Sequence, residues 1–256
     1  MKKKSAKKHK LRSGILKWTF YVLLGLFAFS LFNVILLKYV PVYYTPLMLR
    51  RSWEAAGDGR TLDLRKKWMP LEQISPNLVQ AVVAAEDNYF RGHYGFSPAS
   101  IKAAWVNNKA GKKRRGGSTI SQQCAKNVFT FGYSNYFRKA VEAYYTILIE
   151  LVWGKERIME VYLNVIEMGD GIFGAEACAQ TYFKIPASQL TKRQSALIAV
   201  CLPSPRRFRV SNPTTYLISR QKTIAKLMAQ VGEQKFDKQS LVEARYRYKN
   251  RNKDNK

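Results

Sequence analysis

The chain has 256 residues and carries 44 lysine and arginine residues against 17 acidic ones, a formal net charge of +27. A charge of this sign favours anionic partners such as phosphates, acidic glycans and lipid headgroups, while the absence of any nucleic-acid-binding motif argues against nucleic acid. Two histidines supply a zinc site poorly, and three cysteines, an odd number, argue against a disulfide framework.

The first predicted element is a transmembrane helix over residues 15–37. Its segment from Trp18 to Leu37 has no charged residue and, at about 1.5 Å per residue, crosses a ~30 Å hydrocarbon layer. A cleavable signal has an apolar core of ~7–15 residues and a small-residue cleavage site, whereas Lys38 follows here. The basic tail, 1–14, has no acidic residue, so the positive-inside rule predicts that it stays in the cytoplasm and that the rest is exported.

Residues 38–61 form an aromatic and basic connector that could pack on the following domain or lie in the membrane interface. A single, mainly α domain is predicted over 62–232. One helix is expected to start at Ser75 and Pro76, and helical spacing recurs over 135–152, 155–167, 191–202 and 213–231. Loops are expected at 91–98, 107–117, 169–174 and 203–213. A basic C-terminal tail is assigned to 233–256, and its end, 245–256, is expected to be frayed because it is polar and rich in charge.

Two carboxylates stand at the end of an apolar helical stripe. Leu78, Val82 and Glu86 lie at spacing i, i+4 and i+8, and Asp87 ends the neighbouring row. A carboxylate in a partly desolvated cleft has a raised pKa, which suits a general base. The pattern favours catalysis, with an exposed helix end as the alternative.

A double glycine, Gly116 and Gly117, leads into what looks like another helix start. Ser118, Gln122 and Lys126 follow at spacing i, i+4 and i+8, which would place a hydroxyl, an amide and an ammonium in one row. A helix N-terminus attracts anions through its backbone N–H groups and its dipole. The pattern indicates an anion site, with a solvated polar face as the alternative.

A third cluster is the pair Arg138 and Glu142, which alone would be an ordinary surface ion pair. Together the three clusters resemble the motifs of the peptidoglycan glycosyltransferases, glycosyltransferase family 51, and in particular of the monofunctional biosynthetic transglycosylases. The motifs are E-D-x-x-F-x-x-H-x-G, G-G-S-T-I-x-Q-Q and R-K-x-x-E, and the resemblance covers roughly 62–213. Its motif residues include Glu86, Asp87, Phe90, His93, Gly95, Gly116, Gly117, Ser118, Thr119, Gln122, Gln123, Arg138, Lys139 and Glu142.

The sequence departs from this family's pattern at two positions. Gln194 stands where the segment L-T-x-x-E commonly has glutamate, and Ser134 stands where some relatives carry a basic residue eight positions before Glu142. The resemblance therefore leaves Lys126 and Arg138 as the expected phosphate ligands.

The resemblance implies a lysozyme-like helical glycosyltransferase domain behind one transmembrane helix. Its expected activity is polymerisation of lipid-linked disaccharide-pentapeptide (lipid II) into β-1,4 glycan strands, with inversion and release of polyprenyl diphosphate. Glu86 would accept the proton of the attacking sugar hydroxyl. Glu142, the second catalytic carboxylate, would orient cations or hold a divalent metal, Mg or Mn, and no organic cofactor is expected.

The implied substrate-binding residues are Asp87, Ser118, Thr119, Gln122, Gln123, Lys126, Arg138, Lys139 and Asn164. The residues expected to shape the loops near the site are Phe90, His93, Gly95, Gly116 and Gly117.

Two other functions stay open: a lysozyme-type hydrolase that cleaves peptidoglycan, and a non-enzymatic scaffold that binds cell-wall polymer. Chance S-x-x-K matches lack the companion motifs of a transpeptidase, which indicates a monofunctional transferase. The expected partners are the lipid-linked precursor, the membrane, and cell-wall synthases or division proteins. The expected location is the cytoplasmic (inner) membrane, with one crossing, the N-terminus inside and the catalytic domain on the periplasmic or outer face. The loop from Lys109 to Arg115 is a candidate for membrane contact.

Overall fold

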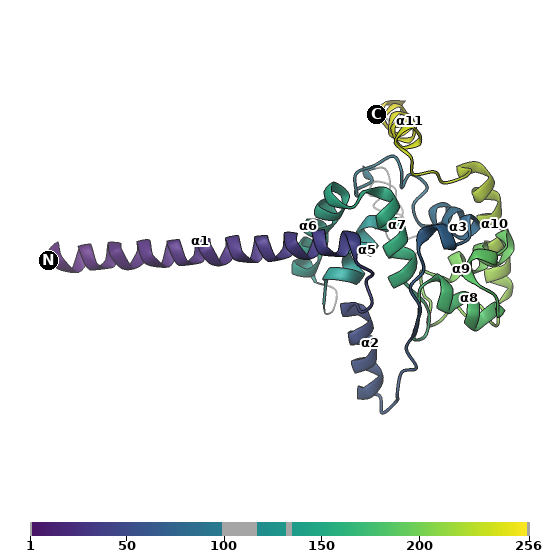
Figure 1. The fold of residues 1–256 in the computed structure, drawn as a ribbon, viewed down its shortest axis with the longest axis horizontal. Coiled ribbons are helices and arrows are strands. Elements are labelled where there is room, and N and C mark those ends of the chain that lie inside the picture. Colours follow the sequence, from purple (N-terminus) through teal and green to yellow (C-terminus); the bar gives the residue numbers. More distant parts are fainter. Residues whose placement is uncertain (1, 99–116, 132–134, 255–256) are drawn as a thin grey trace. The chain divides into compact units, whose positions relative to one another are not determined.

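The computed structural model describes residues 2–98, 117–131 and 135–254, and the chain divides into two compact units, Met1–Val40 and Pro41–Lys256. Gly116, Ser134 and the loop 109–115 lie outside the described residues. The first unit is one helix, α1 (Lys2–Tyr39), drawn in purple in Figure 1. Its apolar part, Gly14–Tyr39, has 26 residues. At 1.5 Å per residue this is roughly 39 Å, so the predicted segment 15–37 lies in a helix long enough for a single membrane crossing.

The second unit is mainly helical, as the sequence predicts. Its helices are α2 (Pro46–Gly57), α3 (Pro76–Glu86), α5 (Ile120–Phe129), α6 (Tyr136–Val152), α7 (Gly154–Val165), α8 (Ala175–Phe183), α9 (Lys192–Cys201), α10 (Thr215–Val231) and α11 (Lys238–Asp254). Short 3-10 turns lie at Leu71–Gln73 and Ala187–Gln189.

Polar caps set several helix starts close to the predicted positions. Ser75 caps α3, and Asn135 caps α6. Thr191 starts α9 in a capping box that Gln194 completes. Either glutamate or glutamine can complete such a box, so Gln194 keeps the cap that the usual glutamate of this segment would provide.

Two packed helix groups form the core. Helix α3 packs against α9 and α10, while α5 packs against α6 and α7 (Figure 1). Leu78 of α3 and Ile120 of α5 are fully buried. The three cysteines, Cys124, Cys178 and Cys201, are also buried, and none of them is in a disulfide. Because α3 and α5 are each fixed by two partners, the end of one and the start of the other can hold side chains in defined positions.

The second unit contains a small three-stranded sheet, where the sequence predicts a helix end and a loop. Its strands are β1 (Arg65–Lys66), β2 (Glu167–Gly169) and β3 (Ile172–Phe173), in the order β1-β3-β2, with β1 parallel and β2 antiparallel to β3. Glu167 therefore lies in a strand, not in the predicted helix, and part of the predicted loop 169–174 is a hairpin. Strands of two or three residues are too short to show an alternating pattern.

The predicted connector contains α2, which packs against α5. Thr45 caps the helix and Pro46 begins it. Arg51 is buried and donates to both carboxylate oxygens of Glu167, with Nη2–Oε1 and Nε–Oε2 distances of 2.7 and 2.9 Å. The connector is expected either to pack on the domain or to lie in the membrane interface. Helix α2 packs on the domain.

The prediction of a frayed end over 245–256 is wrong as far as residue 254, because residues 238–254 form α11. A Cβ added to Gly92 would lie 2.7 Å from the Tyr248 Cβ, so α11 packs directly on the segment after α3. The sequence contains the signal: Leu241, Ala244 and Tyr248 lie at i, i+3 and i+7 in an otherwise polar segment. Its abundant charges hid this narrow stripe.

Candidate active site

Glu86 is the last residue of α3 and is partly buried. Gln123 Nε2 of α5 donates to Glu86 Oε2 at 2.8 Å, and the Tyr162 hydroxyl of α7 donates to Gln123 Oε1 at 3.2 Å. Burial raises the pKa of Glu86; the bond from Gln123 and the charge of Lys126 oppose this rise, and Asp87 adds to it. The structure therefore gives Glu86 a fixed orientation and the raised pKa expected of a general base.

Asp87 is the C-cap residue of α3 and is buried next to Glu86 in the chain. His93 Nε2 lies 2.9 and 3.0 Å from its two carboxylate oxygens, and the backbone N–H of Ile120 donates to Oδ2 at 3.1 Å. Asp87 thereby joins the end of α3, the loop after it and the first turn of α5. These bonds give Asp87 and His93 a positioning role within the protein, while the contact of Asp87 with substrate stays a prediction.

The start of α5 differs from the predicted row of donors. The helix begins at Ile120, so Ser118 precedes it, together with the half-buried Gly117. Thr119 is the N-cap: its hydroxyl accepts from the Gln122 backbone N–H at 3.2 Å, and Gln122 Oε1 accepts from the Thr119 N–H at 3.0 Å. Thr119 and Gln122 are both buried, and their side chains bond the start of the helix. The predicted row of Ser118, Gln122 and Lys126 assumes a helix from Ser118 onward, whereas the helix begins two residues later.

A bond from the same cap fixes the loop after α3. The Thr119 hydroxyl donates to the Gly95 carbonyl at 2.6 Å. Gly95 has φ +77°, and a Cβ there would lie 2.6 Å from Thr146 Cγ2, so the position needs glycine both for its backbone and for space. Phe90 is fully buried under this loop. Gly95 and Phe90 therefore shape the site, as the sequence predicts.

A cavity of about 320 Å³ opens beside Gln123. It is lined by Pro46, Leu47, Arg50, Gln123, Lys126, Asn127, Thr130, Arg138, Ile166, Glu167, Leu202, Pro203 and Pro205. Burial lowers the pKa of Lys126; Glu142 opposes this, and the positive charges of Arg138, Lys139 and Arg50 add to it. The cavity is thus a cationic cleft, with the Gln123–Glu86 pair at its edge.

Arg50 is the cleft residue that the sequence analysis missed. It belongs to α2, and its Nε lies 3.3 Å from Glu54 Oε1. No motif marks it, and it lies 76 positions before Lys126 in the chain. The packing of α2 against α5 brings the two cations to the same cavity, and the neighbouring Arg51–Glu167 pair ties α2 to β2.

Glu142 is buried and orients the cations of the cleft. Arg138 Nη1 lies 3.2 Å from its Oε2, and Lys139 Nζ bonds its Oε1. This arrangement matches the first of the two roles expected for the residue. The second role, holding Mg or Mn, fits poorly: both oxygens bond cations, and no cluster of three metal-ligating side chains occurs in the described parts of the chain.

Asn164, a predicted substrate ligand, is buried and uses its side-chain amide in hydrogen bonds within the protein. Its Oδ1 accepts from the Met69 N–H at 2.8 Å, and its Nδ2 donates to the carbonyls of Met69 and Glu160, each at 2.8 Å. The residue is 1% exposed. Asn164 therefore ties α7 to the segment after β1, a role that the Y-L-N motif alone does not reveal.

A buried ion pair under the site was also missed. Lys155 Nζ and the Ser121 hydroxyl each lie 2.5 Å from Glu150 Oε1, and Lys155 sits 4.6 Å from the centroid of the Phe90 ring. Burial lowers the pKa of Lys155, and Glu150 opposes this. The pair links α5, α6 and α7 below the loop that carries His93. In the sequence, this ion pair is indicated only by the two opposite charges, Glu150 and Lys155, in the otherwise apolar segment 147–155.

A partly buried carboxylate with a raised pKa, next to a cationic cleft, is the arrangement expected of an enzyme that transfers a group away from an anionic leaving group. Comparison with known proteins agrees with this class. The profile of the transglycosylase family matches residues 58–229, and the chain belongs to this family.

Three curated relatives are named biosynthetic peptidoglycan transglycosylase. The chain is 47% identical to the one from Bdellovibrio bacteriovorus over 83% of this chain and 85% of the relative. It is 48% identical to that of Bacteroides thetaiotaomicron, over 84% and 86% of the two chains. The relative from Caulobacter vibrioides is 51% identical over 75% of this chain and 82% of its own.

Proposed function

We propose that the protein is a membrane-anchored peptidoglycan glycosyltransferase that polymerises lipid-linked disaccharide-pentapeptide into β-1,4 glycan strands. Family membership and the names of the relatives support this activity. The observation that carries the mechanism is the bond of 2.8 Å between Gln123 Nε2 and Glu86 Oε2, at the edge of the cationic cleft. This bond supports a mechanism in which a candidate base acts beside a candidate anion site.

The acceptor is the 4-hydroxyl of one substrate unit, and Glu86 takes its proton as the oxygen attacks C1 of the donor sugar. A new C1–O bond forms while the bond from C1 to the polyprenyl diphosphate breaks. Attack on the face opposite the leaving group inverts the anomeric centre, so an α-linked donor becomes part of a β-linked chain. The proton rests on Glu86 and passes to solvent before the next cycle.

The cationic cleft stabilises the leaving diphosphate. This group is a weak base and needs its developing negative charge neutralised more than it needs a proton. Lys126, Arg138 and Arg50 supply the positive charge. Glu142 keeps Arg138 and Lys139 in place, and Ser118 and Gln123 are further donors near the helix start. No step of this mechanism passes through a metal ion.

The proposed setting is the outer face of the cytoplasmic membrane. Support comes from the apolar helix Gly14–Tyr39 and from the basic, acid-free tail before it, which would stay in the cytoplasm. Cell-wall synthases and division proteins are the proposed partners, because they work on the same polymer.

The variant Glu86→Gln tests the assignment of the base. We expect it to fold normally and to form no glycan polymer from purified lipid-linked precursor, because an amide cannot accept the proton. The matched control is Glu72→Gln, an exposed glutamate at a 3-10 turn, which should retain full polymer yield.

Product analysis in the same assay separates the alternatives. Growing chains support the transferase, whereas soluble fragments released from preformed peptidoglycan would indicate a hydrolase. A polymer yield unchanged by Glu86→Gln would overturn the base assignment.

A further inference from the structure

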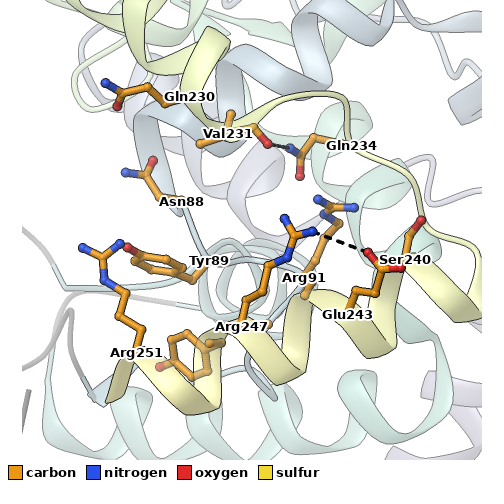
Figure 2. A pocket seen from close by; sticks show the side chains of 13 residues that line it. Asn88, Tyr89, Arg91, Gln230, Val231, Gln234, Ser240, Glu243, Arg247 and Arg251 are labelled. Atoms are coloured by element: carbon orange, nitrogen blue, oxygen red, sulfur yellow. Dashed lines mark hydrogen bonds and ion pairs between the residues drawn. The ribbon is translucent and has the colours of Figure 1, made fainter. Parts of the chain in front are cut away.

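A second cavity, of about 390 Å³, lies outside the cationic cleft (Figure 2). It opens between α11, the end of α10 and the segment that follows α3. It is lined by Asn88, Tyr89, Arg91, Gly92, Gln230, Val231, Gln234, Ser240, Glu243, Ala244, Arg247, Tyr248 and Arg251. None of these residues lines the cleft beside Gln123.

Three arginines, Arg91, Arg247 and Arg251, give this cavity an excess of positive charge. Burial lowers the pKa of Arg91 and the nearby charge of Arg247 lowers it further, while the carboxylates of Asp237 and Glu243 oppose this. Among the described residues that line the cavity, Glu243 is the one acidic residue, and it lies 3.6 Å from Arg247 (Figure 2). Three cations against one carboxylate leave a site that a bound anion would stabilise.

Neutral polar groups complete the lining. The side chain of Gln234 donates from Nε2 to the carbonyls of Val231 and Gly232, at 3.2 and 3.0 Å, so its Oε1 remains an acceptor. Gln230, Ser240 and the Tyr89 ring also face the cavity. Arginine forks pair with carboxylates, while amide and hydroxyl oxygens accept peptide N–H groups. The combination therefore suits a peptide that ends in a carboxylate.

The cavity is built on the segment that positions the base. Asn88 and Tyr89 follow Glu86 by two and three residues. Across the cavity, the Tyr248 hydroxyl donates to Ser97 Oγ at 3.3 Å, and its ring lies 6.0 Å from the ring of His93, which bonds Asp87. The cavity therefore borders the segment that directly follows Glu86, and this connection is what relates it to a substrate bound at the candidate base.

We propose that this cavity binds the C-terminal carboxylate of the peptide carried by the glycan substrate, with Arg247 and Arg91 as its ligands. The inference rests on the proposed function, because only that function supplies a peptide-bearing sugar. The site gives the enzyme selectivity for substrate with an intact, acidic peptide terminus, in addition to the diphosphate contacts in the cleft.

The test compares two lipid-linked substrates, one with a free peptide carboxylate and one with that terminus amidated. For the unaltered protein we expect KM to be about tenfold higher with the amide, as for the loss of one charge-assisted hydrogen bond, with kcat little changed. Arg247→Gln should remove this difference. Arg247 is exposed, so the variant should keep its melting temperature.

Arg245→Gln is the matched control. Arg245 lies on the same helix but stacks 4.4 Å from the Tyr94 ring centroid and does not line the cavity, so its variant should retain the tenfold preference. Equal KM values for the two substrates with the unaltered protein would overturn the proposal. The proposal would also be overturned if Arg247→Gln still had a lower KM for the substrate with the free carboxylate.

A binding measurement keeps this inference separate from the proposed function. Calorimetry with the soluble disaccharide-peptide, as free acid and as amide, needs no turnover. If the protein forms no polymer but binds the free-acid peptide tightly and the amide weakly, the proposed activity is contradicted and the proposed peptide site is supported. Polymer formation without carboxylate dependence would retain the activity and remove the site. Loss of binding to vesicles of anionic lipid in Arg247→Gln, with unchanged peptide binding, would assign the arginines to headgroups and overturn the proposal.

Discussion

Gln123 is the residue through which the surrounding fold controls the base. The Tyr162 hydroxyl donates to its Oε1, and this bond turns Nε2 toward Glu86. A donor of this kind favours the ionised carboxylate, whereas burial favours the protonated form. The pKa of Glu86 is therefore the result of two opposing effects that single substitutions can separate.

Replacing Gln123 with alanine should move the acidic limb of the pH–rate profile to higher pH. The bond that favours ionised Glu86 is lost while burial remains, so the pKa of Glu86 rises further. Because the base must be ionised to act, activity should fall most at low pH and recover toward high pH. Rates measured from pH 5 to 9 check this, and Tyr162→Phe should shift the limb less in the same direction. A shift to lower pH would contradict the assignment.

Arg50 allows the cleft to be tested apart from the motifs. Arg50→Gln should lower kcat/KM by about tenfold or more, because one positive charge facing the leaving diphosphate is lost in a poorly solvated site. The control, Arg60→Gln, removes an exposed arginine that pairs with Asp58 and does not line the cleft. Polymerisation rates of the two variants provide the comparison. Equal rates would place Arg50 outside the site.

At the scale of elements, the sequence predicts best where a helix carries its own cap. Ser75, Asn135 and Thr191 mark three helix starts, and each of these caps is present. Helices α2 and α11 were missed because charged residues masked their narrow apolar stripes. The sheet was missed because its strands have only two or three residues.

For the candidate site, too, local sequence patterns are easier to predict than contacts between distant residues. The motifs point to Glu86, Lys126, Arg138 and Glu142, and the structure brings these residues near one another, while their roles stay predictions. The motifs do not reveal the contacts of Asn164, because its partner, Met69, lies 95 positions away. Such hydrogen bonds depend on tertiary packing, and a sequence motif records only that a residue is needed, not what it contacts.

The loop after α3 should tolerate no side chain at Gly95. Gly95→Ala meets both a φ of +77° and a Cβ contact of 2.6 Å with Thr146 Cγ2. The control is Gly59→Ala, where φ is +68° and nothing lies within 4 Å of the added Cβ. We expect about 1 kcal/mol of lost stability at Gly59 and about 2–4 kcal/mol at Gly95. Thermal or urea unfolding measures the difference; equal losses would mean that the loop can move.

At the scale of the whole molecule, the helix α1 and the enzymatic unit 41–256 are separate compact units. A substrate with a polyprenyl tail stays in the bilayer, so a tethered enzyme searches for it in two dimensions. The apolar length of α1 and the basic tail before it suit this tether.

Removing residues 1–39 should therefore leave the enzymatic unit folded but slow it on vesicles. We expect polymerisation of vesicle-embedded precursor to fall at least tenfold, since the gain in effective concentration is lost. Precursor with a short, water-soluble lipid should be used at an unchanged rate, which serves as the control. An equal loss on both substrates would indicate that the deletion harms the active site itself.

The three buried cysteines should react slowly with thiol reagents. Burial raises the pKa of Cys201 to about 11 and raises those of Cys124 and Cys178 as well, so little thiolate forms at neutral pH. Maleimide reagents should therefore leave the native protein unlabelled. One cysteine introduced at an exposed position of α11, such as Gln239, would then be the sole labelled site. A fluorophore there could follow occupancy of the neighbouring arginine cavity during chain growth, without first removing any native residue.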